Sequence, residues 1–324
     1  MAHAIRIHQP GGPEVMKWEP IEVGEPGAGE VLLRHSAVGL NYIDVYHRTG
    51  LYPVSPPFIP GMAAAGVVEK AGPEVSDLRI GDRVAYGGGP IGAYAEARLI
   101  RADRLVKLPP AISDRQASAM MLQGMTAQYL LRRTYPVQRG DTILVHAAAG
   151  GVGLILCQWA RHLGVTVIGT VSTDEKAVLA KENGCTHPII YTREDFQARV
   201  MEITDGKKVA VVYDSVGKDT FVKSLDCLRP MGMMALFGQS SGPVPSFDLG
   251  QLAVKGSLFI TRPTLMTYTA KREDLLASAK ELFEVVGSGA VTINVNQTYP
   301  LKESVQAHRD LEDRKTTGST VFTV

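Results

Sequence analysis

The stretch GDTILVHAAAGGVGLILCQWAR, residues 140–161, joins branched apolar residues to an apolar helix pattern through a turn of alanine and glycine. The spacing Ala147-x-x-Gly150-x-x-Gly153 is a variant of GxGxxG whose first turn residues are alanine. Such a turn lets the backbone approach a pyrophosphate, and the helix that follows offers N–H groups and partial positive charge. A Cβ at Gly150 or Gly151 would keep the phosphate away, whereas Gly153 allows close helix–strand packing. The stretch predicts a dinucleotide site, although a tight strand-to-helix turn without a ligand has the same pattern.

Strands and helices alternate around this turn. After a helix pattern at 115–133, short apolar runs alternate with helix patterns of about ten residues. This alternation predicts a parallel sheet covered on both faces, and right-handed crossovers close it into a doubly wound domain. The predicted strands are 142–146, 166–171, 188–191, 210–214, 233–237 and 258–261, and the predicted helices are 152–163, 175–183, 194–204 and 220–228.

The two ends of the chain have a different character. The first 120 residues or so are rich in Gly and Pro, with short apolar runs that turn signals separate, which predicts a β barrel or sandwich. A helix is expected at 42–48, closed by Gly50. The tail predicts a helix at 272–286, a strand at 289–298, a helix at 305–311 and a last strand at 321–324. The C-terminal segment is therefore a candidate to rejoin the N-terminal domain.

Composition excludes several classes of protein. The net charge is +1, from 34 Lys and Arg against 33 Asp and Glu, so nucleic acid is not an expected partner. The three cysteines lack CxxC spacing, which favours a reducing compartment. The N-terminus has no signal-peptide pattern, and no apolar run approaches the about 18 residues of a membrane span. We expect a cytoplasmic protein that does not enter a membrane.

The end of the second predicted strand bears on the choice of cofactor. NAD enzymes place an acid there, against the ribose 2′-hydroxyl. Here Ser172 and Thr173 stand at that point, and Asp174, Glu175 and Lys176 follow. Hydroxyls and a lysine suit a 2′-phosphate, which favours NADPH. The same residues are compatible with a helix cap followed by acids in the first turn.

The stretch from Gly140 to Arg161 resembles the signature of the zeta-crystallin-like NADPH:quinone oxidoreductases, a zinc-free branch of the medium-chain dehydrogenase/reductase superfamily, and in particular its bacterial members. The likeness extends along the chain through HQPGGPEVMKWE, VGLNYIDVYHRTGLYP, GDRVAY, VVYDSVGKDTF, SLDCLRPMG, FGQSSG, KGSLFITRP and YPLKESVQAHRDLEDRKTTGSTV.

This resemblance implies a GroES-like catalytic domain at 1–123 and 266–324, and a Rossmann NADPH-binding domain at 124–265. It implies a homodimer through the edge strand near Ser257–Arg262, which is a short apolar strand late in the series. The expected cofactor residues, with those of the Gly-rich turn included, are Asn41, Tyr129, Gly150, Gly151, Val152, Gly153, Ser172, Thr173, Lys176, Tyr191, Ser215, Phe237, Gly238, Ser240, Arg262, Thr264 and Arg314. Tyr46 is expected near the nicotinamide.

Two positions bear on metal binding. Zinc-dependent members of the superfamily use Cys, His and sometimes Glu, and the corresponding positions here are Asn41 and the pair Met62-Ala63. Neither Asn nor Met is a suitable zinc ligand at such a site, so no metal is expected. Ala63 is also a departure from the family, which commonly carries an acid there.

Without a metal, the expected task of the protein is orientation. A quinone ring accepts electrons readily, so the site needs to stack it against the nicotinamide and exclude water. The expected catalytic residues are Asn41, Tyr46 and Tyr52, as hydrogen-bond donors to a quinone oxygen or as stacking partners. The tyrosines are also compatible with simple packing. The resemblance implies one-electron delivery that gives semiquinones, which the residues do not distinguish from two-electron transfer.

Two other functions remain open. Reduction of α,β-unsaturated carbonyls uses the same zinc-free design but needs a proton donor to the α-carbon, which Tyr46 or Tyr52 would supply. A non-catalytic NADPH-binding protein, acting as a crystallin-like store or an RNA binder, is a different class. The neutral charge speaks against RNA as its main partner.

Overall fold

The computed structural model describes residues 2–324. The chain divides into two compact units. The β-rich unit comprises Met1–Met125, Tyr268–Gly287 and Ile293–Val324, and the parallel-sheet unit comprises Thr126–Thr267 and Ser288–Thr292. This is the predicted α/β fold class, with a β-rich part and a doubly wound part.

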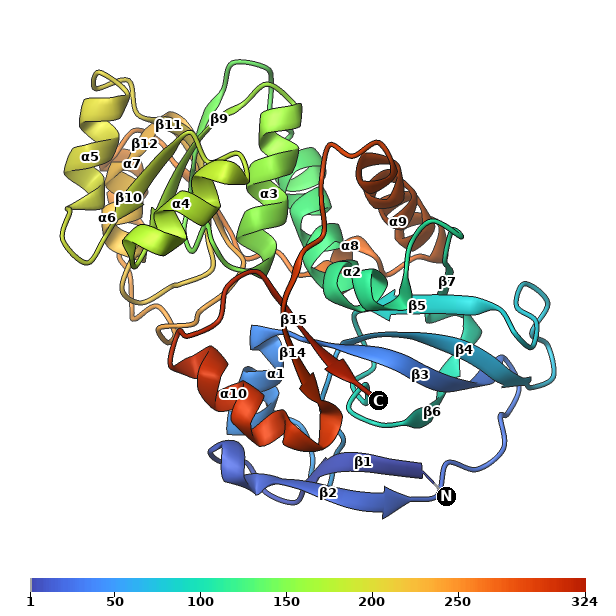
Figure 1. The fold of residues 1–324 in the computed structure, drawn as a ribbon. Coiled ribbons are helices and arrows are strands. Elements are labelled where there is room, and N and C mark those ends of the chain that lie inside the picture. Colours follow the sequence, from blue (N-terminus) through green and yellow to red (C-terminus); the bar gives the residue numbers. More distant parts are fainter. Residues whose placement is uncertain (1) are drawn as a thin grey trace. The chain divides into compact units, whose positions relative to one another are not determined.

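A six-stranded parallel sheet forms the centre of the parallel-sheet unit. Its order is β10-β9-β8-β11-β12-β13, so the chain runs outward from β8 on one side and then returns to β11 on the other (Figure 1). This is the 3-2-1-4-5-6 order of dinucleotide-binding folds, and the reversal falls between β8 and β11. The strands are β8 (Thr142–Val145), β9 (Thr166–Val171), β10 (His187–Ile190), β11 (Val209–Asp214), β12 (Leu228–Leu236) and β13 (Phe259–Thr261).

Helices connect these strands, and the strand residues Leu144, Ile168 and Val212 are buried in the core beneath them. Helix α3 packs against α4, and α5 packs against α6. Right-handed crossovers place these two pairs on opposite faces of the sheet, because the direction of winding reverses between β8 and β11. The helices are α3 (Gly151–His162), α4 (Asp174–Glu182), α5 (Phe196–Ile203), α6 (Phe221–Asp226) and α7 (Gly250–Val254). Helix α2 (Asp114–Tyr129) and a π-helical turn, η3 (Leu130–Thr134), lead into the sheet.

Several boundaries differ from the sequence prediction, among them those of α5, α6 and β12. Helix α5 begins at Phe196 and not at 194, because the Asp195 side chain accepts hydrogen bonds from the N–H groups of Gln197 and Ala198 and so caps the helix. Helix α6 ends at Asp226, and β12 begins at Leu228 and not at 233. The early part of β12 pairs with Val209 before a register shift, a break that hides the strand from its apolar pattern.

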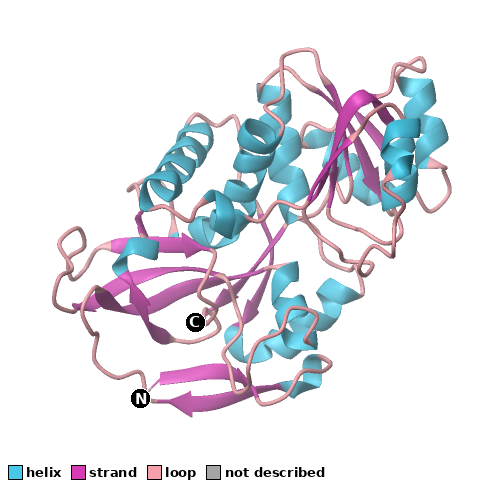
Figure 2. Cartoon of the chain, turned by 180° about the vertical axis from the view of Figure 1, so that it is seen from behind, coloured by secondary structure: helices cyan, strands magenta, loops and turns pink. Residues whose placement is uncertain are grey.

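The β-rich unit contains both ends of the described chain. Its main sheet has the order β14-β15-β3-β4-β5-β7, with β6 also paired to β3, and β15 is antiparallel to β3 (Figure 1). A separate hairpin of β1 and β2 lies beside the N-terminal label in Figure 2. The strands are β1 (Ala2–Ile7), β2 (Met16–Ile21), β3 (Glu30–Leu40), β4 (Ala63–Ala71), β5 (Arg83–Gly87), β6 (Ala97–Arg101), β7 (Val106–Lys107), β14 (Val295–Pro300) and β15 (Ser319–Thr323).

Short helices complete the two units. Helix α1 (Tyr42–Thr49) ends at Gly50, whose φ of 81° is the left-handed conformation expected of a closing glycine. The remaining helices are η1 (Pro13–Val15), η2 (Ala102–Arg104), α8 (Leu265–Tyr268), α9 (Arg272–Gly287), η4 (Leu301–Glu303) and α10 (Ser304–Glu312).

The strand predicted at 289–298 is wrong in its first half, since β14 begins at Val295. The backbone of Thr292 is bonded to a side chain instead of a neighbouring strand. Its N–H donates to Gln158 Oε1 at 2.8 Å, and its carbonyl accepts from Gln158 Nε2 at 3.2 Å.

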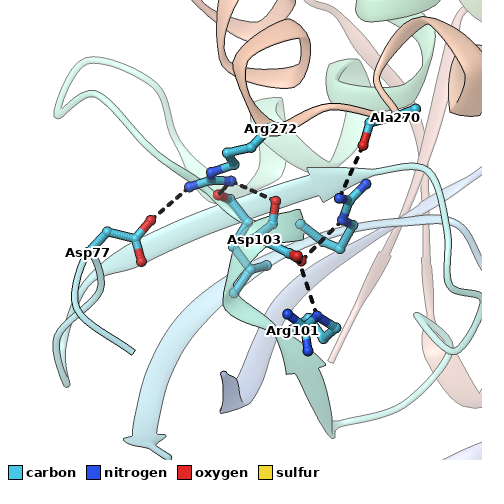
Figure 3. A network of polar contacts seen from close by, with 7 residues as sticks. Asp77, Arg101, Asp103, Ala270 and Arg272 are labelled. Atoms are coloured by element: carbon cyan, nitrogen blue, oxygen red, sulfur yellow. Dashed lines mark hydrogen bonds and ion pairs between the residues drawn. The ribbon is translucent and has the colours of Figure 1, made fainter. Parts of the chain in front are cut away.

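Within the β-rich unit, Arg272 joins the start of α9 to segments from the N-terminal part of the chain (Figure 3). Its guanidinium donates to the carbonyls of Asp103 at 2.9 Å and Leu105 at 2.5 Å, and to Asp77 Oδ2 at 3.0 Å. Arg104 adds a bond to the carbonyl of Ala270 at 3.3 Å. These contacts explain why a helix so late in the chain folds with the N-terminal strands.

Candidate functional site

The expected cofactor residues of the parallel-sheet unit gather at one edge of its sheet. Each group follows the carboxyl end of a strand, and the carboxyl ends of parallel strands meet at the same edge. Gly150–Gly153 follow β8, Ser172, Thr173 and Lys176 follow β9, Tyr191 follows β10, Ser215 follows β11, Phe237, Gly238 and Ser240 follow β12, and Arg262 and Thr264 follow β13. This is the edge at which doubly wound sheets bind ligands, next to the reversal between β8 and β11.

The Gly-rich turn has the geometry that an approaching phosphate needs. Ala147 has a φ of 56°, so an alanine adopts the left-handed conformation at the start of the turn. Gly150 precedes the first residue of α3 with φ −82° and has no side-chain cap. A Cβ at Gly150 would lie 3.2 Å from the carbonyl oxygen of Ala147, a contact that a small shift relieves. The helix end is therefore open to a ligand.

Gly153 has a different role from Gly150. A Cβ there would lie 2.3 Å from the carbonyl oxygen of Ala147 and 2.7 Å from that of Ala148. Both contacts are with backbone, which has little freedom to move. Only glycine lets the first turn of α3 lie this close to the turn after β8.

The residues after β9 form a helix cap, which was one of the two interpretations of this stretch. Thr173 Oγ1 accepts from the N–H of Lys176 at 3.3 Å and begins α4. Asp174 is held by both terminal nitrogens of Arg193, at 2.8 and 2.6 Å. The Arg193 guanidinium lowers the pKa of Asp174, and its positive charge offsets the acid that would oppose a phosphate at this place. Thr192 Oγ1 donates to the carbonyl of Ser172 at 3.0 Å, which joins the loops after β9 and β10.

Asp214 organises the loop after β11, and the sequence analysis did not assign it a role. Its side chain is buried, and Oδ1 accepts from the N–H groups of Val216 at 2.7 Å and Gly217 at 3.1 Å. Oδ2 accepts from Thr220 Oγ1 at 2.7 Å. The loop so fixed carries Ser215. An acid at the end of a buried strand, directly before Ser215, was the available signal.

The loops after β11 and β12 lie against each other. A Cβ on Gly238 would be 2.6 Å from the carbonyl oxygen of Ser215, and the N–H of Ser240 donates to that same oxygen at 3.1 Å. Arg262 Nη1 donates to the carbonyl of Leu236 at 2.9 Å and ties in the residues after β13. The structure therefore brings Ser215, Gly238 and Ser240 together.

Asn41 is the centre of the candidate site in the β-rich unit. It follows β3, begins α1 and is 6% exposed. Its Oδ1 accepts from Gln123 Nε2 at 3.2 Å, and its Nδ2 donates to the carbonyl of Gly39 at 3.2 Å. Gln123 is held in turn by Ser319 Oγ, which donates to Gln123 Oε1 at 2.6 Å. Gln123 was not singled out in the sequence, because its partners lie far away in the chain.

Aromatic rings adjoin Asn41 on α1 and in the loop after it. The ring centroids of Tyr46 lie 5.4 Å from those of Tyr42 and 5.0 Å from those of Tyr52. Tyr46 is 7% exposed, and its carbonyl accepts from the N–H of Tyr52 at 3.0 Å. The structure thus brings Tyr46 and Tyr52 together. Burial raises the pKa of Tyr42.

The positions of the superfamily's zinc ligands come together, but their side chains do not suit zinc. Ala63 pairs with Gly39 across β3 and β4, which places Met62 and Asn41 at the same end of the sheet. Both Met62 and Ala63 are buried. Amide and thioether groups are not the thiolate, imidazole and carboxylate ligands that zinc takes. Across residues 2–324, no three His, Cys, Asp or Glu side chains are grouped to hold a metal ion.

Two further residues that the sequence predicts to contact the cofactor lie outside these clusters. Tyr129, at the end of α2, is 2% exposed and belongs to the parallel-sheet unit. Arg314 follows α10 in the β-rich unit, and its N–H donates to the carbonyl of Leu311 at 3.1 Å. Arg314 has a φ of 60°, so this turn is left-handed without a glycine.

Comparison with known proteins places the chain in a family. A profile described as alcohol dehydrogenase GroES-like domain matches residues 27–110, and one described as zinc-binding dehydrogenase matches residues 151–291. The chain is 52% identical to a quinone oxidoreductase of Pseudomonas aeruginosa, over 99% of both chains. It is 49% identical to a 2-haloacrylate reductase of a Burkholderia species, again over 99% of both. The solved quinone oxidoreductase of Escherichia coli, complexed with NADPH, is 46% identical with a TM-score of 0.97, covering 99% of this chain and 100% of that one.

The fold is that of the medium-chain dehydrogenase/reductase class, with a GroES-like and a Rossmann-like part. Within that class the chain belongs to the quinone oxidoreductase family. The resemblance read from the sequence is confirmed.

Proposed function

We propose that this protein is an NADPH-dependent quinone oxidoreductase. The observation that carries the proposal is the full-length similarity to quinone oxidoreductases, one of them solved with NADPH. Three segments support it: the Gly-rich turn suits a pyrophosphate, the capped β9–α4 loop suits a 2′-phosphate, and the Asn41 turn presents an oriented amide. We retain the division into a GroES-like catalytic domain, residues 1–123 and 266–324, and a Rossmann domain, residues 124–265.

The residues fit NADPH. The open end of α3 at Gly150 suits the pyrophosphate, and Thr173 and Lys176 after β9 suit the 2′-phosphate. The resemblance also assigns Arg314 to that phosphate, which its planar guanidinium matches. Tyr129, Gly151, Val152, Ser172, Tyr191 and Ser215 are assigned along the cofactor, and Phe237, Gly238, Ser240, Arg262 and Thr264 at its nicotinamide end. Bound NADPH supplies the reducing equivalents for the acceptor.

The protein's own part at the acceptor is orientation. Gln123 and Gly39 fix the Asn41 amide so that its nitrogen and oxygen are distinguished, and the second N–H of Nδ2 is the group we assign to a quinone oxygen. Tyr46 and Tyr52 supply aromatic faces and hydroxyls in one cluster. Aromatic walls also exclude water. No step requires a Lewis acid, since a quinone is already electron-poor.

A second candidate activity is reduction of an α,β-unsaturated acid or carbonyl. It is favoured by the 49% identity to a 2-haloacrylate reductase. This reaction needs a proton at the α-carbon, and Tyr46 or Tyr52 would donate it. The two activities therefore differ in what they require of the tyrosine hydroxyls.

The proposed function is tested by NADPH oxidation with quinones of graded size and with enones and 2-haloacrylate. We expect kcat/KM to be highest with quinones. Asn41→Ala and Tyr46→Phe should lower it about tenfold without loss of fold, as expected for one lost hydrogen bond. Tyr299→Phe, on β14, is the matched control. Tight NADPH binding with no acceptor turnover would instead support a non-catalytic binding protein, and loss of enone but not quinone turnover in Tyr52→Phe would identify a proton donor.

We also propose a homodimer through the segment Ser257–Arg262. Strand β13 is the edge of the parallel sheet, as predicted, and Phe259 on it is 57% exposed. Met231 and Val254, which flank its start, are 71% and 81% exposed. Antiparallel pairing of β13 with its copy would cover this apolar edge. Light scattering should give twice the chain mass for the wild type and a monomer for Phe259→Lys, and a wild-type monomer at micromolar concentration would reject the dimer.

A cytoplasmic location is part of the proposal. Cys157, Cys185 and Cys227 are free and buried, which suits a reducing compartment. Among the described residues, no helix has the length and apolar character needed to cross a membrane.

A further inference from the structure

A chain of buried polar side chains runs through the β-rich unit to the Asn41 turn. Asp44 and Arg48 lie on α1, Tyr94 lies between β5 and β6, and His308 lies on α10. All four are 0% exposed. Tyr94 Oη is 3.1 Å from Asp44 Oδ2 and 3.0 Å from His308 Nε2, and Arg48 Nη1 is 3.4 Å from His308 Nδ1. Burying ionisable groups is costly, so such a chain needs a reason.

The far end of the chain is anchored by an ion pair. Arg48 Nη2 donates to Glu312 Oε2 at 2.8 Å, and Nη1 lies 2.8 Å from Oε1. Glu312 is the last residue of α10. The Arg48 guanidinium is thus held in one orientation, with Nη1 directed at His308.

The direction of every bond follows from the donors and acceptors. A guanidinium has no acceptor, so His308 Nδ1 accepts from Arg48. Burial, with the charge of Arg48, lowers the pKa of His308 to about 3, so its ring is neutral and its one proton is on Nε2. Nε2–H therefore donates to Tyr94 Oη. The hydroxyl hydrogen of Tyr94 is left to donate to Asp44 Oδ2.

Asp44 is the last acceptor, and it holds the backbone of Asn41. Its Oδ2 also accepts from the N–H of Asn41 at 2.9 Å. Its Oδ1 is buried and has no hydrogen-bond partner within the described residues. Any proton on this carboxyl therefore sits on Oδ1, and Oδ2 remains the acceptor for both Tyr94 and Asn41 in either protonation state.

Tyr94 contacts the second segment of the site as well. A Cβ on Gly61 would lie 2.4 Å from Tyr94 Cδ1, so the ring lies directly on this glycine, whose φ is 98°. Gly61 precedes Met62, which is at the same end of the sheet as Asn41. One tyrosine therefore fixes the Asn41 turn through its hydroxyl and the Met62 segment through its ring.

We propose that Arg48, His308 and Tyr94 are positioning residues for the reaction at Asn41: their directed hydrogen bonds fix the Asp44 carboxylate and, through it, the Asn41 turn. This inference rests on the proposed function, in which the Asn41 amide is assigned to a quinone oxygen. Arg48, His308 and Tyr94 themselves are not assigned to contact the cofactor or the quinone.

Kinetics of a matched pair at His308 test the role. Glutamine keeps one donor and one acceptor in place of the two ring nitrogens, and leucine keeps neither. We expect His308→Leu and Tyr94→Phe to lower kcat for quinone reduction about tenfold, while the Kd for NADPH, measured by fluorescence titration, changes less than about threefold. His308→Gln should return kcat to within about threefold of the wild type. Equal kcat values for His308→Gln and His308→Leu would overturn the proposal.

Two measurements do not depend on the activity. The ¹⁵N shifts of His308 should show the neutral Nε2–H tautomer at neutral pH, and an Nδ1–H tautomer or an imidazolium would contradict the assigned direction. The amide of Asn41 should exchange with solvent about tenfold faster in Tyr94→Phe than in the wild type, with the amide of Val145 as the control. If both results are obtained but the wild type reduces no quinone, the proposed function is wrong and the directed hydrogen bonds are still supported. If the exchange rate of the Asn41 amide is unchanged in Tyr94→Phe, the positioning role is wrong whatever the activity.

Discussion

Gln123 donates a hydrogen bond from Nε2 to Asn41 Oδ1 at 3.2 Å, across 82 positions of the sequence. Because Gln123 also accepts from Ser319 Oγ, its own amide cannot turn over without losing that bond. The orientation of Asn41 is therefore set by a residue on α2 and a residue on β15.

Gln123→Glu should disrupt this orientation. A carboxylate oxygen would replace the Nε2 donor and face Asn41 Oδ1, so the Asn41 amide would be driven to invert. We expect kcat/KM for quinone reduction to fall about tenfold or more, which corresponds to the loss of one hydrogen bond in a buried site. Steady-state NADPH oxidation measures this. Gln116→Glu, at a half-buried position in the first turn of the same helix, is the control. Equal rates for both variants would show that the Asn41 orientation is unimportant.

Substitutions at the two glycines of the turn, Gly150 and Gly153, should have different effects. Gly150→Ala should fold, because its Cβ needs only a small shift from Ala147 O at 3.2 Å, but should weaken NADPH binding about tenfold or more by filling the phosphate approach. Gly153→Ala should lose about 3 kcal/mol of unfolding free energy, since its Cβ meets backbone oxygens at 2.3 and 2.7 Å. Thermal unfolding and NADPH titration of both variants separate the effects. A Gly150→Ala protein that binds NADPH normally would exclude this turn as the pyrophosphate site.

The parallel-sheet unit was the more predictable part, because its signals are local. Apolar runs and the bare turn placed β9 at 166–171 without error and located every other strand. Element ends were missed where a side chain decides the backbone, as Asp195 does for α5 and Gln158 does for Thr292.

The residues that hold the candidate site residues in place were not predictable from the sequence. Gln123, Asp44 and Asp214 act through partners that the fold brings together, and each resembles an ordinary helix or loop residue in isolation. The sequence located Asn41 from the resemblance, but it could not give the direction of the Asn41 amide. That direction depends on Ser319, close to the other end of the chain.

Lys176 should determine the preference for NADPH over NADH. Its backbone N–H is used by the Thr173 cap, which places its side chain in the first turn of α4, after β9. Lys176→Ala should lower the ratio of kcat/KM for NADPH to that for NADH about tenfold, as expected for a lost contact between a charged group and a phosphate. Lys181→Ala, in the last turn of the same helix, should leave the ratio unchanged. An unaltered ratio in Lys176→Ala, or a wild type that prefers NADH, would refute this assignment of the 2′-phosphate.

Because His35 is buried in its neutral form, the folded protein should become less stable as the pH falls. Its Nδ1–H donates to the carbonyl of Ala95 at 2.7 Å, and its Nε2 accepts from Tyr86 Oη at 3.0 Å. Burial lowers the pKa of His35 to about 4, opposed by the Ala95 bond and assisted by the charge of Arg98. The unfolded chain therefore binds a proton that the folded protein does not, from about pH 6.5 down to about pH 4. The stabilisation due to neutral His35 is complete above this window and is lost through it on acidification.

This dependence is measurable as a difference between variants. His35→Asn places an amide donor near the Nδ1 position and does not titrate, so it should lose about 2 kcal/mol less unfolding free energy than the wild type between about pH 7 and pH 5. The comparison between the variant and the wild type is needed because burial raises the pKa of Asp44 to about 7. Asp44 therefore makes the unfolding free energy change with pH in the opposite direction to His35. Urea unfolding followed by tryptophan fluorescence is suitable, since Trp18 lies in the same unit as His35. His162→Asn, at an exposed position on α3, is the control. If His35→Asn and the wild type lose the same free energy, His35 is protonated in the folded protein at pH 5 and its burial does not exclude the proton.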